Sequence, residues 1–63
     1  MPNIGARLKN LRGKRSRKSV AQALNISYST YVKYERNERI PRDSVKAAIA
    51  QFYGQTVQTI FFD

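Results

Sequence analysis

The stretch Val20–Glu35, VAQALNISYSTYVKYE, has the pattern of two short helices joined by a tight turn. Its first half continues a helix that Ser16 can cap, and Asn25-Ile26-Ser27 forms the turn. Ser27 can cap the next helix, which we expect to run to about Arg36 with small or polar side chains exposed in its first turn. Ile26 is apolar where loops are usually polar, so we expect it to fill the angle between the two helices.

The rest of the chain also has helical spacing, which predicts an all-α domain of five short helices. Asn3 can cap the first helix and Gly13 ends it, while Asn37 can take a left-handed conformation after the third. Ile40-Pro41 begins a fourth helix because proline suits a first helical turn, and Gly54 ends that helix. A last short helix opens at residue 55 or 56. The side chains expected to face the core are Ile4, Leu8, Leu11, Val20, Ala21, Leu24, Tyr31, Tyr34, Val45, Ala48, Ile49, Phe52, Val57, Ile60 and Phe61.

Composition limits the possible functions. Sixty-three residues predict one domain, residues 1–63, with no space for a catalytic cleft plus a substrate-binding lobe. The sequence has neither Cys nor His, so we expect no disulfide, metal site or cofactor, and no enzymatic activity. No apolar run approaches the roughly 18 residues that span a membrane, and the amino-terminal sequence lacks the apolar segment of a signal peptide, so we expect a cytoplasmic protein.

The charge balance indicates a polyanionic partner. Twelve Lys and Arg residues oppose four acidic residues, which gives a formal net charge of +8. A capped helix with a polar first turn, on a domain this small and basic, is suited to the major groove of DNA. The residues therefore predict sequence-specific binding to double-stranded DNA.

Four segments, IGARLKNLR, SVAQALNISYSTYVKYE, YERNERIPRD and VQTIFF, together resemble the phage-repressor and Cro type of helix-turn-helix regulators, also called the Xre type. The resemblance extends from Ile4 to Phe62. The chain departs from the family in a shorter link after Arg12, and in Arg17, which stands where the family usually carries Gln. The resemblance implies a transcriptional regulator, expected to be a repressor, that binds a near-palindromic operator as a homodimer and resides with the bacterial nucleoid when bound.

The resemblance also implies that the helix at about residues 27–36 lies in the major groove. The residues at the base-reading positions are Tyr28, Ser29, Thr30 and Lys33. Lys33 can donate to guanine, the hydroxyls of Ser29 and Thr30 can pair with either class of base, and Tyr28 can pack against a thymine methyl group. Thr30 can equally be packed or bonded to the helix backbone.

A run of basic residues extends from Arg12 to Lys18. A run of charge is usually a solvated face, but the resemblance places this one where the second helix crosses the DNA backbone. Arg17 is the leading candidate for phosphate contact because free amides and the helix dipole at a helix start favour an anion. The predicted phosphate-binding residues are Arg17, Lys14, Arg15, Lys18, Arg36, Asn37, Arg39 and Arg42.

Two further roles follow from the resemblance. It pairs Arg12 with Glu35 as a partly buried structural ion pair, because an exposed carboxylate at the end of a basic reading helix would repel DNA. It also makes Ile60, Phe61 and Phe62 the dimer contact, since three consecutive large side chains on a short helix cannot all face one core. We expect Phe62 to face outward; the alternative is that it folds over Leu8 or Leu11 and completes the core of a monomer.

Two other binding functions stay open at the level of sequence. The chain can be an antitoxin-like or antirepressor-controlled module whose DNA binding depends on an antagonist or co-regulator protein, which a toxin-like reading frame beside its gene would favour. It can also bind RNA or DNA through charge alone, in which case scrambled DNA would compete as well as any particular site.

Overall fold

Side-chain caps begin the first three helices of the computed structural model, which describes residues 3–62. The Asn3 side chain accepts a hydrogen bond from the Ala6 amide at the start of α1 (Ile4–Arg12). The Ser16 side chain accepts a hydrogen bond from the Ser19 amide at the start of α2 (Arg17–Ala23). The Ser27 side chain accepts one from the Thr30 amide at the start of α3 (Tyr28–Glu35). The three predicted caps are therefore confirmed, and each satisfies one amide that the helix itself leaves unpaired.

Residues with positive φ connect these helices. Gly13 (φ 59°) follows α1, Asn25 (φ 59°) lies in the turn between α2 and α3, and Asn37 (φ 58°) follows α3. The left-handed conformation predicted for Asn37 is thus confirmed; asparagine adopts it more readily than most residues because its short side chain bonds locally. Ile26 packs against the core from the turn, as predicted.

The fourth helix begins later than expected. Helix α4 (Asp43–Tyr53) starts after Arg42, whose carbonyl accepts hydrogen bonds from the amides of Val45 and Lys46. The prediction that Pro41 lies in its first turn is therefore wrong, and Pro41 is instead buried in the extended segment before the helix. Gly54 (φ 67°) ends α4 as predicted, and η1 (Gln58–Phe62), a single wide π-helical turn, follows it.

The buried core combines side chains from all five elements. Tyr31 of α3 is fully buried at its centre, and its hydroxyl lies 2.8 Å from the hydroxyl of Tyr53. The prediction that Phe52 faces inward is wrong, because Ala50 and Tyr53 turn toward the core and leave Phe52 36 % exposed. The buried hydrophobic residues are Leu8, Val20, Ala21, Tyr31, Tyr34, Ile49, Ala50, Ile60 and Phe61.

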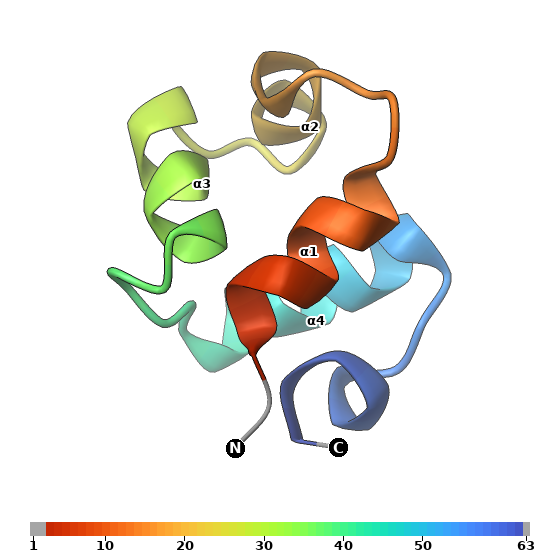
Figure 1. The fold of residues 1–63 in the computed structure, drawn as a ribbon. Helices are drawn as coiled ribbons and strands as arrows, with labels where there is room; N and C mark the ends of the chain where they lie inside the picture. Colours follow the sequence, from red (N-terminus) through yellow and green to blue (C-terminus); the bar gives the residue numbers. More distant parts are fainter. Residues whose placement is uncertain (1–2, 63) are drawn as a thin grey trace.

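The helices form one all-α bundle around this core (Figure 1). Helix α1 packs against α3 and against η1, and α2 also packs against α3. Helix α3 lies at one edge of the bundle, with α1 and α2 beside it (Figure 1). Among residues 3–62, no helix combines the length and apolar character needed to cross a membrane.

Candidate nucleic-acid interface

The first turn of α3 presents polar side chains to solvent. Tyr28 is 52 % exposed, and Ser29 and Lys33 are also exposed. Thr30 differs from them because it is half-buried and its hydroxyl accepts a hydrogen bond of 2.7 Å from Ser27. Of the predicted base-reading residues, three therefore have free surface and Thr30 is engaged with the cap of its own helix.

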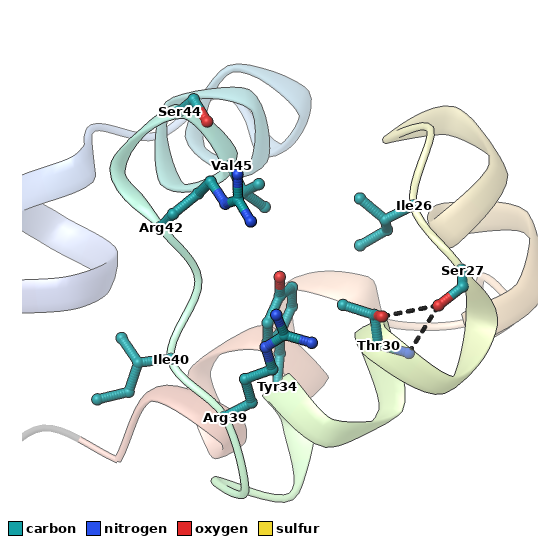
Figure 2. Close-up of a pocket in the computed structure, with 9 residues that line it drawn as sticks. All are labelled: Ile26, Ser27, Thr30, Tyr34, Arg39, Ile40, Arg42, Ser44 and Val45. Carbon is teal, nitrogen blue, oxygen red and sulfur yellow. Dashed lines mark hydrogen bonds between the residues drawn. The ribbon is translucent and has the colours of Figure 1, made fainter.

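A groove of about 530 Å³ lies between the start of α3 and the segment that leads into α4 (Figure 2). Ser27 and Thr30 line one side of it, next to Ile26 from the turn, with the hydrogen bonds between Ser27 and Thr30 drawn as dashed lines. The guanidinium groups of Arg39 and Arg42 lie on the opposite side (Figure 2). The predicted phosphate ligands Arg39 and Arg42 therefore lie close to the exposed first turn of α3.

A second hollow, also of about 530 Å³, lies where the start of α2 approaches the start of α3. Tyr28 contributes to its wall from α3, and Lys18 is exposed beside it. Its lining residues are Arg12, Ser16, Arg17, Lys18 and Tyr28. The amino-terminal half of α3 is thus bordered by two hollows, and each of them is lined by basic side chains.

Behind the second hollow, Glu35 accepts hydrogen bonds from two arginines. The distance from Arg12 Nε to Glu35 Oε2 is 2.8 Å, and from Arg17 Nε to Glu35 Oε1 it is 3.1 Å. The Glu35 side chain is 3 % exposed, that of Arg12 14 % and that of Arg17 39 %. The structure therefore brings Arg12 and Glu35 together as an almost buried pair and adds Arg17 to it, a contact that the sequence did not suggest.

The titration of this cluster follows from its contacts. Burial raises the pKa of the Glu35 carboxyl, but hydrogen bonding to Arg12, Tyr31 and Arg17 outweighs it, so the pKa lies below its ordinary value of 4.5. The hydrogen bond to Glu35 raises the pKa of Arg12. For Tyr31, burial and then the hydrogen bond with Tyr53 raise the pKa above its ordinary value. Glu35 is therefore ionised, and Tyr31 neutral, throughout the physiological range.

Asn37 has a structural role that the sequence did not indicate. Its Oδ1 accepts a hydrogen bond of 2.9 Å from the Gly5 amide, and its Nδ2 donates to Asn3 Oδ1 at 3.0 Å. Gly5 is required there because a Cβ atom at that position would collide with the Glu35 carbonyl oxygen. The phosphate contact of Asn37 stays a prediction, and in the structure its amide group joins the end of α3 to the start of α1.

The other predicted phosphate ligands differ in their freedom. Arg15 is turned toward α4, with its guanidinium 5.4 Å from the ring centroid of Phe52 and 5.7 Å from that of Tyr53. Arg36 is exposed and forms a surface ion pair of 3.0 Å with Glu38. Lys14 is exposed in the link between α1 and α2. Arg15 is therefore bound to the protein surface, whereas Lys14 is free to reach a polyanion.

At the carboxyl-terminal end, the predicted dimer residues separate into two groups. Ile60 and Phe61 are buried in the core of their own chain, so they have no surface with which to touch a second copy. Phe62 is 59 % exposed, and the Lys46 ammonium lies 4.9 Å from its ring centroid. The dimer contact stays a prediction, and of these three residues Phe62 is the one whose side chain has the exposed surface that such a contact needs.

Arg7 is a further residue whose contact the sequence did not reveal. Its Nη1 donates to the carbonyl oxygens of Thr59 and Ile60, at 2.9 and 3.0 Å. These carbonyls belong to the last turn, where the helix leaves them without an amide partner. Arg7 therefore fixes η1 against α1. In the sequence, the one signal for this role is the position of Arg7 beside the apolar stripe of the first helix.

Comparison with known proteins agrees with this geometry. A family model described as a helix-turn-helix domain matches residues 3–60. The chain belongs to the helix-turn-helix family of DNA-binding domains. In this helix-turn-helix domain, α2 and α3 form the motif, with α3 as its second, exposed helix. No curated protein and no solved structure matches the chain.

Proposed function

We propose that this helix-turn-helix domain is a sequence-specific transcriptional regulator of the phage-repressor and Cro type, acting as a repressor in the bacterial cytoplasm. The observation that carries the proposal is that a hollow lined by basic side chains lies on each side of the first turn of α3. With α3 in the major groove, Tyr28, Ser29 and Lys33 contact bases. Arg17 from one hollow, and Arg39 and Arg42 from the other, contact the phosphates on either side.

Phosphate contacts supply most of the affinity in this proposal. With about 4–6 contacts per subunit, the logarithm of the binding constant falls with the logarithm of salt concentration by about 0.9 for each contact. The contributing residues are Lys14, Arg17, Lys18, Arg36, Arg39 and Arg42. Base contacts from α3 then separate an operator from random DNA.

Selection of bound sequences from random duplex DNA tests the proposal. A symmetric consensus is expected, with half-sites about 34 Å apart for two subunits on one face of the duplex. A scrambled duplex of equal length and composition is the control. Equal competition by the scrambled and selected duplexes would refute sequence-specific reading and leave only binding through charge.

We also propose that the operator-bound form is a homodimer joined through Phe62. A ring that is 59 % exposed at the end of so small a domain supports this contact. Phe62→Asp should still fold, because the new carboxylate would lie near the Lys46 ammonium. The variant should be a monomer that binds the full operator weakly and without cooperativity. Phe52→Asp is the matched control, since Phe52 is an exposed aromatic residue on another element and its loss should leave cooperativity intact. Sedimentation and binding isotherms measure both, and a cooperative Phe62→Asp variant would exclude the contact.

A further inference from the structure

The two arginines bound to Glu35 differ in how many of their guanidinium nitrogens have a hydrogen-bond acceptor. Arg12 has an acceptor for each of its nitrogens: Nε and Nη2 lie 2.8 and 3.3 Å from the Glu35 oxygens, and Nη1 lies 2.8 Å from the Arg15 carbonyl oxygen. For Arg17, the described part of the chain provides an acceptor at Nε alone, which is 3.1 Å from Glu35 Oε1. Its two terminal nitrogens carry the remaining N–H groups of the guanidinium.

The cluster around Glu35 also carries positive charge that its carboxylate does not neutralise. Two guanidinium groups share one carboxylate, so the cluster of Arg12, Arg17 and Glu35 has a surplus positive charge. Arg17 is 39 % exposed and Arg12 is 14 % exposed, so the surplus is available to solvent at Arg17. Arg17 and Lys18 line the hollow beside Tyr28, and a negatively charged ligand there would contact the free end of the guanidinium.

We infer that Glu35 is a positioning residue for anion binding, which holds Arg17 by its Nε so that both terminal nitrogens face the hollow and bind a DNA phosphate. This inference rests on the proposed DNA-binding function. Because the resemblance to the phage-repressor family leads one to expect an uncharged Gln at position 17, the device depends on a residue in which this chain departs from that family.

A guanidinium is needed for this arrangement. Its fork allows Nε to donate sideways to a carboxylate while the two terminal nitrogens donate forward to a phosphate. A lysine has one ammonium group on a flexible stem, so it cannot serve both partners from a fixed position. The Glu35 contact removes rotamer freedom from Arg17 before DNA arrives, and binding then loses less entropy.

Arg17→Lys separates positioning from charge. It should weaken binding to operator and random duplex by about two- to tenfold, the range for one side chain that must be ordered on binding, with the salt slope unchanged. Arg15→Lys is the control. Arg15 lies over the rings of Phe52 and Tyr53 and outside the proposed phosphate-binding set, so its replacement should leave affinity within about twofold of wild type.

Glu35→Gln supplies the second measurement, because it keeps the shape of the side chain and removes its charge. The loss of affinity caused by Arg17→Ala should be smaller in the Glu35→Gln background than in wild type, when both are measured at a temperature where circular dichroism shows the variants folded. If Glu35→Gln does not fold, the Arg17→Lys comparison decides alone, since that variant leaves the contact between Arg12 and Glu35 in place.

Two results would overturn the inference while leaving the proposed function standing. One is an Arg17→Lys variant that binds like wild type, which would mean that charge alone matters at this position. The other is an equal effect of Arg17→Ala in both backgrounds. A wild-type chain without salt-dependent affinity for duplex DNA would instead overturn the proposed function, and the role of Glu35 with it.

Discussion

Within residues 3–62, α3 is fixed to α1 by polar contacts at its carboxyl end, whereas the polar contacts at its amino end stay within its own cap and first turn. Glu35 is almost completely buried against Arg12, and the Gly5 amide reaches across to Asn37. By contrast, Ser27 bonds only to side chains and amides of the first turn of α3, and Tyr28 is half-exposed. The fold therefore orients α3 from its carboxyl end and leaves its amino end free to contact a ligand.

This comparison predicts that substitutions at the two ends affect different properties. Changes at the carboxyl end should lower the free energy of unfolding, and should affect DNA binding through the folded population and, at Glu35, through the position of Arg17. Changes at the amino end should lower affinity for an operator while the domain stays as stable as before. The predictions that follow are ordered by the size of the expected effect.

The largest effect is expected for Glu35→Ala. Removal of this carboxylate leaves two guanidinium groups side by side, one of them nearly buried, and should lower the free energy of unfolding by about 3–5 kcal/mol. A domain of this size has a total stability of about 3–9 kcal/mol, so the variant should lose a large fraction of it. Urea denaturation followed by circular dichroism measures the change.

Glu38→Ala is the control for Glu35→Ala. Glu38 forms an exposed ion pair with Arg36, and such pairs contribute about 0–1 kcal/mol. Equal destabilisation by the two substitutions would contradict the distinction between a buried and an exposed carboxylate at this end of α3.

The same carboxylate should make stability depend on pH. The pKa of Glu35 lies below its ordinary value of 4.5 in the folded state, so its contribution is complete above that value and is lost as the pH falls through the folded pKa. Glu35→Gln has no carboxyl group to titrate. The difference in unfolding free energy between wild type and Glu35→Gln should therefore narrow as the pH falls from 4.5 through the folded pKa. A constant difference over this range would show that the charge of Glu35 is not what stabilises the junction.

At the free end of α3, Ser29→Ala should reduce operator affinity by about 1–3 kcal/mol and change stability by no more than about 0.5 kcal/mol. Thr30→Ala should show the reverse pattern, with a loss of about 0.5–1.5 kcal/mol in stability, because the Thr30 hydroxyl is bonded to Ser27. Affinities for the selected operator and for scrambled DNA, measured beside thermal melts, distinguish these outcomes. Equal losses of specific and random binding in Ser29→Ala would remove Ser29 from the base-reading set.

The contrast between the two ends also explains how much the sequence could predict. Helix positions and caps depend on residues three or four apart, so Ser16, Ser27 and the burial of Tyr31 could be predicted from spacing alone. The inward face of α4 could not, because it depends on how Tyr53 reaches Tyr31 across the core. Local periodicity locates the apolar face of a helix only to within one residue, so it cannot decide between Phe52 and Tyr53.

The candidate site divides in the same way. Spacing along α3 gave the exposed faces of Tyr28, Ser29 and Lys33. Which basic side chain lies beside which acceptor depends on the placement of α1 and α2 against α3, and a list of charged residues does not contain that information. Arg17 on Glu35 and the Asn37 amide on Gly5 are both contacts between residues far apart in the sequence.

The smallest expected effect distinguishes two neighbouring basic residues that the sequence treated alike. Lys14 is exposed, and its replacement by Ala should make the salt slope of DNA binding shallower by about 0.9, as for one lost phosphate contact. Arg15 lies over the rings of Phe52 and Tyr53, so Arg15→Ala should leave the slope unchanged and lower stability by about 0.5–1 kcal/mol. Binding isotherms at several salt concentrations, beside urea denaturation, measure both quantities. A slope that changes equally in the two variants would mean that Arg15 leaves the aromatic rings when DNA binds. Arg15 would then belong with Lys14 among the basic side chains that contact phosphate.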